Sequence, residues 1–151
     1  MIQEAAIGVG SNVGARAEQI YAAQRALEAT VGIEDVEAAS LIATAPVLEE
    51  ADASHPAYFN TVFVLKTSLS AEALMARLLA IEASFGRRRD GAVSPRTIDL
   101  DLLLLGDEVR SSPALTLPHP RIGERTFVLD PLRELRPSLA KKYEALPPYC
   151  R

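Results

Sequence analysis

The sequence lacks tryptophan, has one cysteine among 151 residues and is only 5% aromatic. A single cysteine, Cys150, excludes an intramolecular disulfide, and its lack of neighbouring cysteine or histidine argues against a zinc site. Such sparing use of cysteine is typical of proteins in a reducing compartment, so we expect a cytoplasmic protein.

Long apolar runs are absent as well. No segment approaches the roughly 20 apolar residues that a membrane-spanning helix needs, and the N-terminus has no basic stretch before an apolar one. Basic residues are the minority, with 16 Lys and Arg against 20 Asp and Glu, a net charge of −4. We therefore expect no membrane span and no secretory leader, and the charge argues against nonspecific nucleic-acid binding as the main task.

What the sequence does have is an apolar content of 48% and no long linker. These features predict that residues 1–151 form one domain with a sizeable core. At this size we expect a monomer.

Two carboxylates interrupt the most apolar stretch, which runs from Ile98 to Leu105. As a β-strand, this stretch places Asp99 and Asp101 on one face, with their Cα atoms roughly 6 to 7 Å apart. The opposite face then carries Ile98, Leu100, Leu102 and Leu104. Because two like charges this close need a neutralising cation, the pair predicts a site for a hard metal such as Mg²⁺. The alternative is a pair of solvated carboxylates on an exposed face.

Arginines cluster just before these carboxylates, at Arg87, Arg88, Arg89 and Arg96. Their mutual repulsion is relieved if anions lie between them, and a polyphosphate carrying bound magnesium has this pattern of charge. Taken alone, the cluster also fits a solvated charged loop.

Three other polar residues are candidates for a site. Asn60 lies on an apolar strand, so its amide needs a partner in the fold or in a planar polar ligand. His119 lies between two prolines and precedes Arg121 and Arg125, which suits either phosphate contacts or a rigid surface turn. Glu82 lies near a helix C-terminus, where the helix dipole disfavours a negative charge, and is either held by a partner or, by default, solvated.

The order of the apolar patterns predicts an α+β fold. Residues 5–12, 33–43, 58–66 and 98–105 are predicted strands, and residues 15–31 and 70–86 are predicted helices, the second with Ser70 as its N-cap. Two successive βαβ halves make a ferredoxin-like βαββαβ sandwich, an antiparallel sheet with helices on one face. The chain beyond residue 105 is a C-terminal extension, whose tail from Lys141 we expect to add little to the core.

An ordered set of short motifs extends from the first predicted strand to Pro137. The motifs are Gly8-Val9-Gly10-Ser11-Asn12, Thr44-Ala45-Pro46, Tyr58-Phe59-Asn60, Ile81-Glu82, Gly86-Arg87-Arg88-Arg89, Pro95-Arg96-Thr97-Ile98-Asp99-Leu100-Asp101, Leu117-Pro118-His119-Pro120 and Arg125-Thr126-Phe127-Val128-Leu129. In this order and at these spacings, the chain resembles the 6-hydroxymethyl-7,8-dihydropterin pyrophosphokinase family of folate biosynthesis.

The resemblance implies transfer of pyrophosphate from the co-substrate ATP to the pterin hydroxymethyl group, with release of AMP. It assigns two Mg²⁺ ions to Asp99 and Asp101, and catalytic roles to both carboxylates and to Arg87 and Arg96. For ATP, it implies contacts of the phosphates with Arg87, Arg89, Arg96, His119 and Arg125, and of the nucleoside with Glu82, Thr116 and the backbone beside Ile98 and Leu102. For the pterin, it implies ring stacking on Tyr58 and Phe127 and edge contacts with Asn60, Thr44, Pro46 and Val47.

The chain departs from the family pattern before the Pro-Arg pair, where members often carry a basic residue and a tryptophan and this chain has Ala92, Val93 and Ser94. Leu79 also stands where a polar nucleoside contact can occur. A loop without its aromatic seal leaves a site wetter, so we expect weaker pterin binding rather than lost chemistry. Two other functions stay open, namely a different Mg²⁺-dependent nucleotidyl or phosphoryl transferase and a noncatalytic ferredoxin-like binding module.

Overall fold

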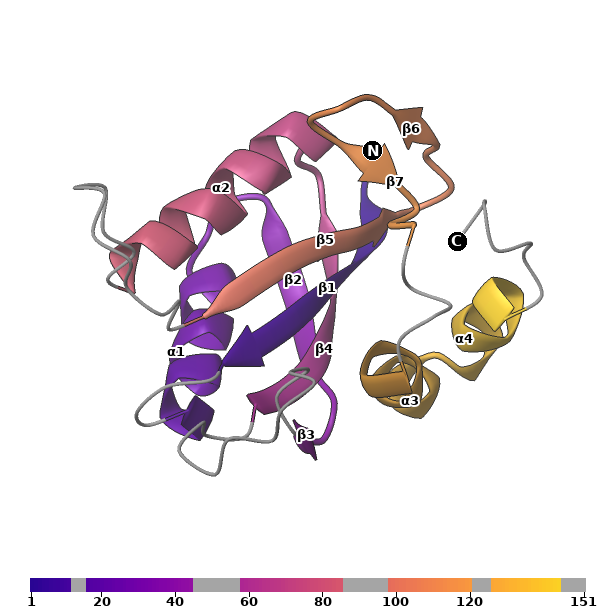
Figure 1. Cartoon of the computed structure of the whole chain (residues 1–151). Coiled ribbons are helices and arrows are strands. Elements are labelled where there is room, and N and C mark those ends of the chain that lie inside the picture. The colour runs from indigo at the N-terminus through magenta and orange to yellow at the C-terminus, as the bar shows by residue number, and fades with distance from the viewer. Residues whose placement is uncertain (12–15, 45–57, 86–97, 121–125, 145–151) are drawn as a thin grey trace.

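One antiparallel sheet organises the computed structural model of the chain, which describes residues 1–11, 16–44, 58–85, 98–120 and 126–144. Its strands are β1 (Gln3–Ser11), β2 (Ile33–Ala38), β3 (Ile42–Thr44), β4 (Tyr58–Thr67) and β5 (Asp99–Leu105). The strand order is β2-β4-β1-β5, and β3 also pairs with β4 (Figure 1). Helices α1 (Arg16–Glu28) and α2 (Ala71–Ser84) connect β1 to β2 and β4 to β5. The α+β, ferredoxin-like prediction is confirmed.

The main core lies between this sheet and the two connecting helices. Alternate residues of β1, such as Ile7 and Val9, point toward α1 and α2 and are almost fully buried. The cap of α2 is the predicted one, since Ser70 Oγ accepts a hydrogen bond from the Ala73 N–H at 3.1 Å. The helix predicted over residues 15–31 ends earlier, at Glu28, so Val31 lies beyond it and is 93% exposed.

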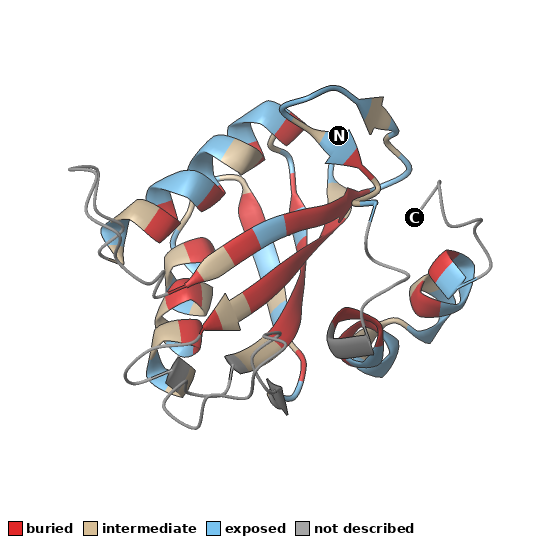
Figure 2. Cartoon of the chain, in the orientation of Figure 1, coloured by how far each residue is buried: buried red, intermediate tan, exposed pale blue. Residues whose placement is uncertain are grey.

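The C-terminal extension covers the opposite face of the sheet. Helices α3 (Thr126–Leu135) and α4 (Pro137–Glu144) pack there over a second core around Val64 and Leu132 (Figure 2). Ala140 and Tyr143, three residues apart on α4, share its inward face and are buried. The expectation that the tail from Lys141 adds little to the core is therefore wrong for the described residues 141–144.

Polar contacts also fasten α3 to the sheet. The Arg136 guanidinium pairs with Glu37, and its Nε donates to Glu4 Oε2 at 3.1 Å. The Glu37 contact and, to a smaller extent, the Glu4 contact raise the pKa of Arg136. Ser40, in the link between β2 and β3, donates its N–H and its hydroxyl to the Glu134 carboxylate, each at 3.0 Å. The end of α3 is thus attached to the strands on that side of the sheet.

The second predicted strand, residues 33–43, is divided into β2 and β3. Its register on β4 shifts between Glu34 and Glu37, where Asp35 has a positive φ of 51°. After β2 ends, the Ala39 carbonyl accepts a hydrogen bond from the Thr61 hydroxyl at 2.9 Å. The register shifts again between the two strands, since Ala38 pairs with Phe63 whereas Ile42 pairs with Asn60, so regular pairing is interrupted there and one apolar pattern gives two strands.

A second irregularity lies in β5. Ile7 of β1 pairs with Leu102 whereas Ala6 pairs with Leu104, so Leu103 is an extra residue in β5. Ile98, Leu100 and Leu102 face the main core as predicted. The bulge turns Leu104 to the other core, beside α3, so its predicted orientation is wrong.

Beyond β5, a turn at Gly106, with a φ of 53°, leads to a hairpin of β6 (Arg110–Ser111) and β7 (Thr116–Leu117). Leu117 anchors this hairpin in the main core. The backbone N–H of His119 then donates to the Leu103 carbonyl at 2.8 Å, which attaches the following segment to β5. In the segments that the structure describes, no helix combines the length and the apolar content needed to cross a membrane.

Candidate active site

A row of three paired residues crosses the middle of the sheet. Gly10 of β1 pairs with Asn60 of β4 on one side and with Asp99 of β5 on the other. All three lie on the sheet face that α3 and α4 cover in part, because their neighbours along each strand belong to the main core on the opposite face. The glycine therefore separates an amide from a carboxylate on one face.

Glycine is needed in this row because the Asn60 side chain lies over it. A Cβ added to Gly10 would come within 3.1 Å of Asn60 Oδ1, closer than most real contacts of that atom. At Gly8 the nearest atom is a Leu103 methyl at 3.4 Å, which is ordinary contact. Close packing against a neighbouring side chain therefore favours glycine at Gly10 more than at Gly8.

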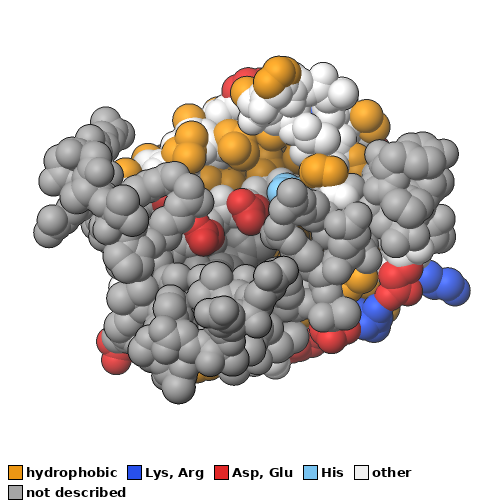
Figure 3. All heavy atoms as spheres, in the orientation of Figure 1, with side chains coloured by type: hydrophobic (Ala, Val, Ile, Leu, Met, Phe, Trp, Pro, Cys, Tyr) orange, Lys and Arg blue, Asp and Glu red, His pale blue; other side chains and the backbone are white. Residues whose placement is uncertain are grey.

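The two carboxylates occupy one face of β5 as predicted. Gly8 pairs with Asp101 just as Gly10 pairs with Asp99, so β1 holds both residues in register. Asp99 is half-buried and Asp101 is exposed. Figure 3 shows acidic side chains and a histidine near one another on one face of the molecule, next to a group of apolar side chains.

The carboxylates of Asp99 and Asp101 suit a magnesium ion that a substrate also coordinates. In the described part of the chain, no group of three or more His, Cys, Asp or Glu side chains could hold a metal by itself. Two carboxylates on an open strand face leave the remaining positions of a hard cation to water and to phosphate oxygens, which is how Mg²⁺ is usually bound beside nucleotides. Asp99 and Asp101 therefore fit the metal that the sequence predicts.

A hollow of about 270 Å³ opens beside Asp101. Its walls come from α2, from the outer side of β5 and from the segment that contains β6 and β7, and they include Met75, Asp101, Leu102, Leu115, Thr116 and His119. Its lining thus mixes apolar side chains with a carboxylate, a hydroxyl and an imidazole. Thr116, His119 and Leu102, which the resemblance links to ATP, are brought together here, whereas Ile98 is buried in the main core.

Glu82 is buried rather than solvated. Its side chain is 6% exposed, and Oε2 accepts a hydrogen bond from the backbone N–H of Leu100 at 3.0 Å. The default expectation of a solvated glutamate is wrong, and the expectation of a partner that holds it is confirmed. The partner lies in β5, between the two aspartates.

Several predicted residues are described only by their backbone. Thr44, the last residue of β3, pairs with Tyr58, the first residue of β4, two residues before Asn60. Phe127 lies in the first turn of α3, which packs against β3 and β4. The elements that carry Thr44, Tyr58 and Phe127 thus meet at the Asn60 side of the row. Predictions outside the described residues are those for Pro46, Val47, Arg87, Arg88, Arg89, Ala92, Val93, Ser94, Arg96, Arg121 and Arg125.

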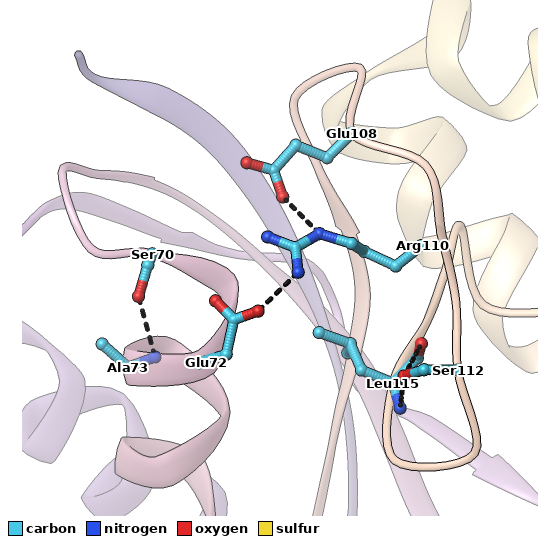
Figure 4. A network of polar contacts seen from close by, with 7 residues as sticks. All are labelled: Ser70, Glu72, Ala73, Glu108, Arg110, Ser112 and Leu115. Atoms are coloured by element: carbon cyan, nitrogen blue, oxygen red, sulfur yellow. Dashed lines mark hydrogen bonds and ion pairs between the residues drawn. The ribbon is translucent and has the colours of Figure 1, made fainter.

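The sequence analysis missed the contacts that hold the hairpin in place. Arg110 at the start of the hairpin pairs through Nη1 with Glu72 of α2 at 2.5 Å and through Nε with Glu108 at 3.5 Å (Figure 4). The pKa of Glu72 is lowered, first by a backbone hydrogen bond and then by Arg110. The sequence also did not single out Met75, which lines the hollow. Met75 lies seven residues before Glu82 on the same face of α2, and this spacing is the signal that could have identified Met75.

Comparison with known proteins identifies the family. The profile of 7,8-dihydro-6-hydroxymethylpterin-pyrophosphokinases matches residues 6–137, which include the sheet, the hairpin and α3. The chain belongs to this family. It is accordingly an ATP-dependent pyrophosphokinase, and most of α4 lies beyond the matched span.

Curated relatives resemble the chain over most of its length. The 2-amino-4-hydroxy-6-hydroxymethyldihydropteridine pyrophosphokinase of Pseudomonas aeruginosa is 39% identical over 139 residues, 92% of this chain and 84% of that protein. The corresponding protein of Synechocystis is 38% identical over 133 residues, 88% of this chain and 66% of that protein. A folic acid synthesis protein of Schizosaccharomyces pombe is 36% identical over 141 residues, 93% of this chain and 19% of that protein.

Proposed function

We propose that this protein transfers pyrophosphate from ATP to the hydroxymethyl group of 6-hydroxymethyl-7,8-dihydropterin, a step of folate biosynthesis, on the sheet face described above. The observation that carries the proposal is the row of Asn60, Gly10 and Asp99 across three strands. It presents an amide and a metal-binding carboxylate on either side of a residue without a side chain. A flat heterocycle and a metal-bound polyphosphate can therefore meet over Gly10.

The hollow beside Asp101 is the proposed nucleoside site. Met75 and Leu115 offer apolar contacts to a base, while Thr116 and the backbone of Leu102 offer polar ones. From there the phosphates would pass His119 and Asp101 toward the row. Arg87, Arg89, Arg96 and Arg125 are the proposed additional phosphate contacts, because guanidinium groups bind phosphate oxygens in pairs.

The pterin is proposed to lie at the Asn60 side of the row. An amide has both a donor and an acceptor, which suits the edge of a heterocycle that presents the same groups. Tyr58 and Phe127 are the proposed stacking partners, and Thr44, Pro46 and Val47 the proposed main-chain contacts. The meeting of β3, β4 and α3 at this side supports that placement.

In the proposed mechanism, Asp99 and Asp101 would hold two Mg²⁺ ions beside the ATP phosphates, and these ions would neutralise charge on the transferring group. The pterin hydroxyl oxygen bonds to the β-phosphorus while the bond from that phosphorus to the α–β bridging oxygen breaks, so that AMP leaves. Arg87 and Arg96 stabilise the developing charge, and Asp99 accepts the hydroxyl proton. Positioning by the sheet provides most of the rate, since no strong base is required.

Further parts of the proposal concern the whole protein. We expect residues 1–151 to act as one pyrophosphokinase domain, as a monomer and in the cytoplasm, in keeping with the single cysteine and the small size. Ala92, Val93 and Ser94 replace bulkier residues common in the family, and we expect them to weaken pterin binding more than turnover.

The deciding experiment measures AMP release from ATP and Mg²⁺, with and without the pterin, in the unmodified protein and in Asp101→Ala. AMP that depends on pterin and is lost in the variant is the expected result, with a rate loss of at least about 100-fold because a metal ligand is removed. Near-normal AMP release by Asp101→Ala would rule out the proposed metal site. ADP in place of AMP would instead indicate ordinary phosphoryl transfer, and metal-independent ATP binding without turnover would indicate a binding module.

A further inference from the structure

Glu82 is a buried carboxylate whose hydrogen bond ends between the two proposed metal ligands. It is a buried residue of α2, and its Oε2 accepts from the N–H of Leu100 at 3.0 Å. Leu100 is flanked in sequence by Asp99 and Asp101. A buried charge is costly unless it is hydrogen-bonded, so this contact explains how a glutamate is accommodated there.

The position of β5 in the sheet indicates what this contact stabilises. β5 is the last strand on its side of the described sheet, and only β1 pairs with it there. In an antiparallel pair, alternate residues direct their backbone groups to opposite sides of a strand. Leu100 directs its N–H to Glu82 and not to β1, so the strand is held from both sides at the point where the aspartates project.

We infer that Glu82 is a positioning residue for the metal site: by fixing the Leu100 backbone, it keeps Asp99 and Asp101 on one face at the spacing that a shared Mg²⁺–polyphosphate needs. The inference rests on the proposed function of those aspartates. It differs from the nucleoside contact that the family resemblance implies for Glu82.

The geometry favours this role over direct contact with metal or nucleotide. Asp99 and Asp101 project from the face of β5 opposite the main core, whereas Glu82 contacts the backbone of β5, at the Leu100 N–H. Glu82 is also not among the described residues that line the hollow beside Asp101. Its carboxylate therefore acts on the site through the Leu100 backbone.

The first test measures hydrogen exchange of the Leu100 amide by NMR in the metal-free protein. Glu82→Ala removes the acceptor and should reduce protection of this amide roughly tenfold or more, while amides paired to β1, such as those of Asp99 and Asp101, should change less. Glu82→Gln keeps a carbonyl acceptor and should restore protection. Unchanged protection of Leu100 in Glu82→Ala would overturn the inference.

The second test measures binding of Mn²⁺ with α,β-methylene-ATP, which cannot be cleaved at the bond that transfer breaks. Loss of a residue that orients a metal ligand commonly costs 10- to 100-fold in metal affinity, so Glu82→Ala should weaken Mn²⁺ binding about tenfold or more. Glu82→Gln should bind within about twofold of the unmodified protein, since it retains the acceptor.

Leu74→Ala is the matched structural control. Leu74 lies on α2, is 0% exposed and packs in the same core, so its truncation should lower the unfolding midpoint without weakening Mn²⁺ binding. If Leu74→Ala weakens binding as much as Glu82→Ala does, the effect is general destabilisation and the inference fails. If Asp101→Ala binds Mn²⁺ normally, the proposed metal site fails instead, whatever Glu82→Ala shows.

Discussion

At the scale of single residues, the site depends on what Gly10 lacks. Its missing side chain leaves room for the Asn60 amide, whose Oδ1 would lie 3.1 Å from an added Cβ. We predict that Gly10→Ala raises the KM for the pterin about tenfold by displacing Asn60, since an overpacked atom commonly costs 1 to 3 kcal/mol. The KM for ATP should change much less, because the hollow lies on the far side of β5.

Gly8→Ala is the control for this prediction. It adds the same methyl group two residues away, where the nearest atom is a Leu103 methyl at 3.4 Å. Steady-state kinetics with both substrates should give a smaller increase in pterin KM than Gly10→Ala. Equal increases in the two variants would contradict the role assigned to the Asn60 contact.

At the scale of elements, the hairpin of β6 and β7 forms one wall of the hollow and is tied to α2 by Arg110 and Glu72 (Figure 4). Both side chains are exposed to solvent, and an ion pair between exposed side chains contributes little to stability. We predict that Glu72→Gln or Arg110→Gln raises the KM for ATP about twofold to fivefold and leaves the KM for the pterin unchanged.

A charge exchange tests whether the pair itself matters. The double variant Glu72→Arg with Arg110→Glu should recover part of the lost ATP affinity, and added salt should reduce the difference between the unmodified protein and the single variants. Asp35→Asn removes an exposed pair with Lys66 at the end of β4 and should leave both KM values unchanged. No recovery in the double variant would show that the hairpin is held by its apolar contacts, such as Leu117.

At the scale of the whole molecule, α3 and α4 close the second core. Burial of Tyr143 in α4, with a smaller effect of Asp107, raises the pKa of its hydroxyl from 10 to about 12. Because the folded state favours the protonated form, this stabilisation is complete below pH 10 and is lost as the pH rises through about 12. We predict that the unfolding free energy falls by roughly 2 to 3 kcal/mol over this range through Tyr143 alone.

Tyr143→Phe provides the comparison, because it keeps the buried ring and removes the titrating hydroxyl. Denaturant unfolding at pH 9 and near pH 12 should show a smaller loss of stability in the variant than in the unmodified protein. Equal losses would mean that other groups, such as lysines, account for the alkaline transition and that α4 does not hold Tyr143 out of water.

Much of the architecture follows from local rules. The period of two in the run from Ile98 to Leu102 places Asp99 and Asp101 on one face in any strand, and Ser70 caps α2 through a contact within one helical turn. The order of strands and helices was equally readable, because each element carries its own apolar period. The side of the sheet on which the aspartates project therefore required no knowledge of distant contacts.

Tertiary structure alone decided the features that depend on residues far apart in the chain. Leu104 turned to the second core because pairing with β1 introduced a bulge that no local pattern of β5 records. Glu82 is buried because Leu100 of β5, 18 residues further along the chain, donates its N–H to the Glu82 carboxylate. Tyr143 is a core residue because α1 and α2 cover one face of the sheet and α4 packs on the other. The sequence by itself determined the chemical groups and the faces on which they lie; the packing of helices and strands determined which groups meet, because burial and register are properties of pairs of elements.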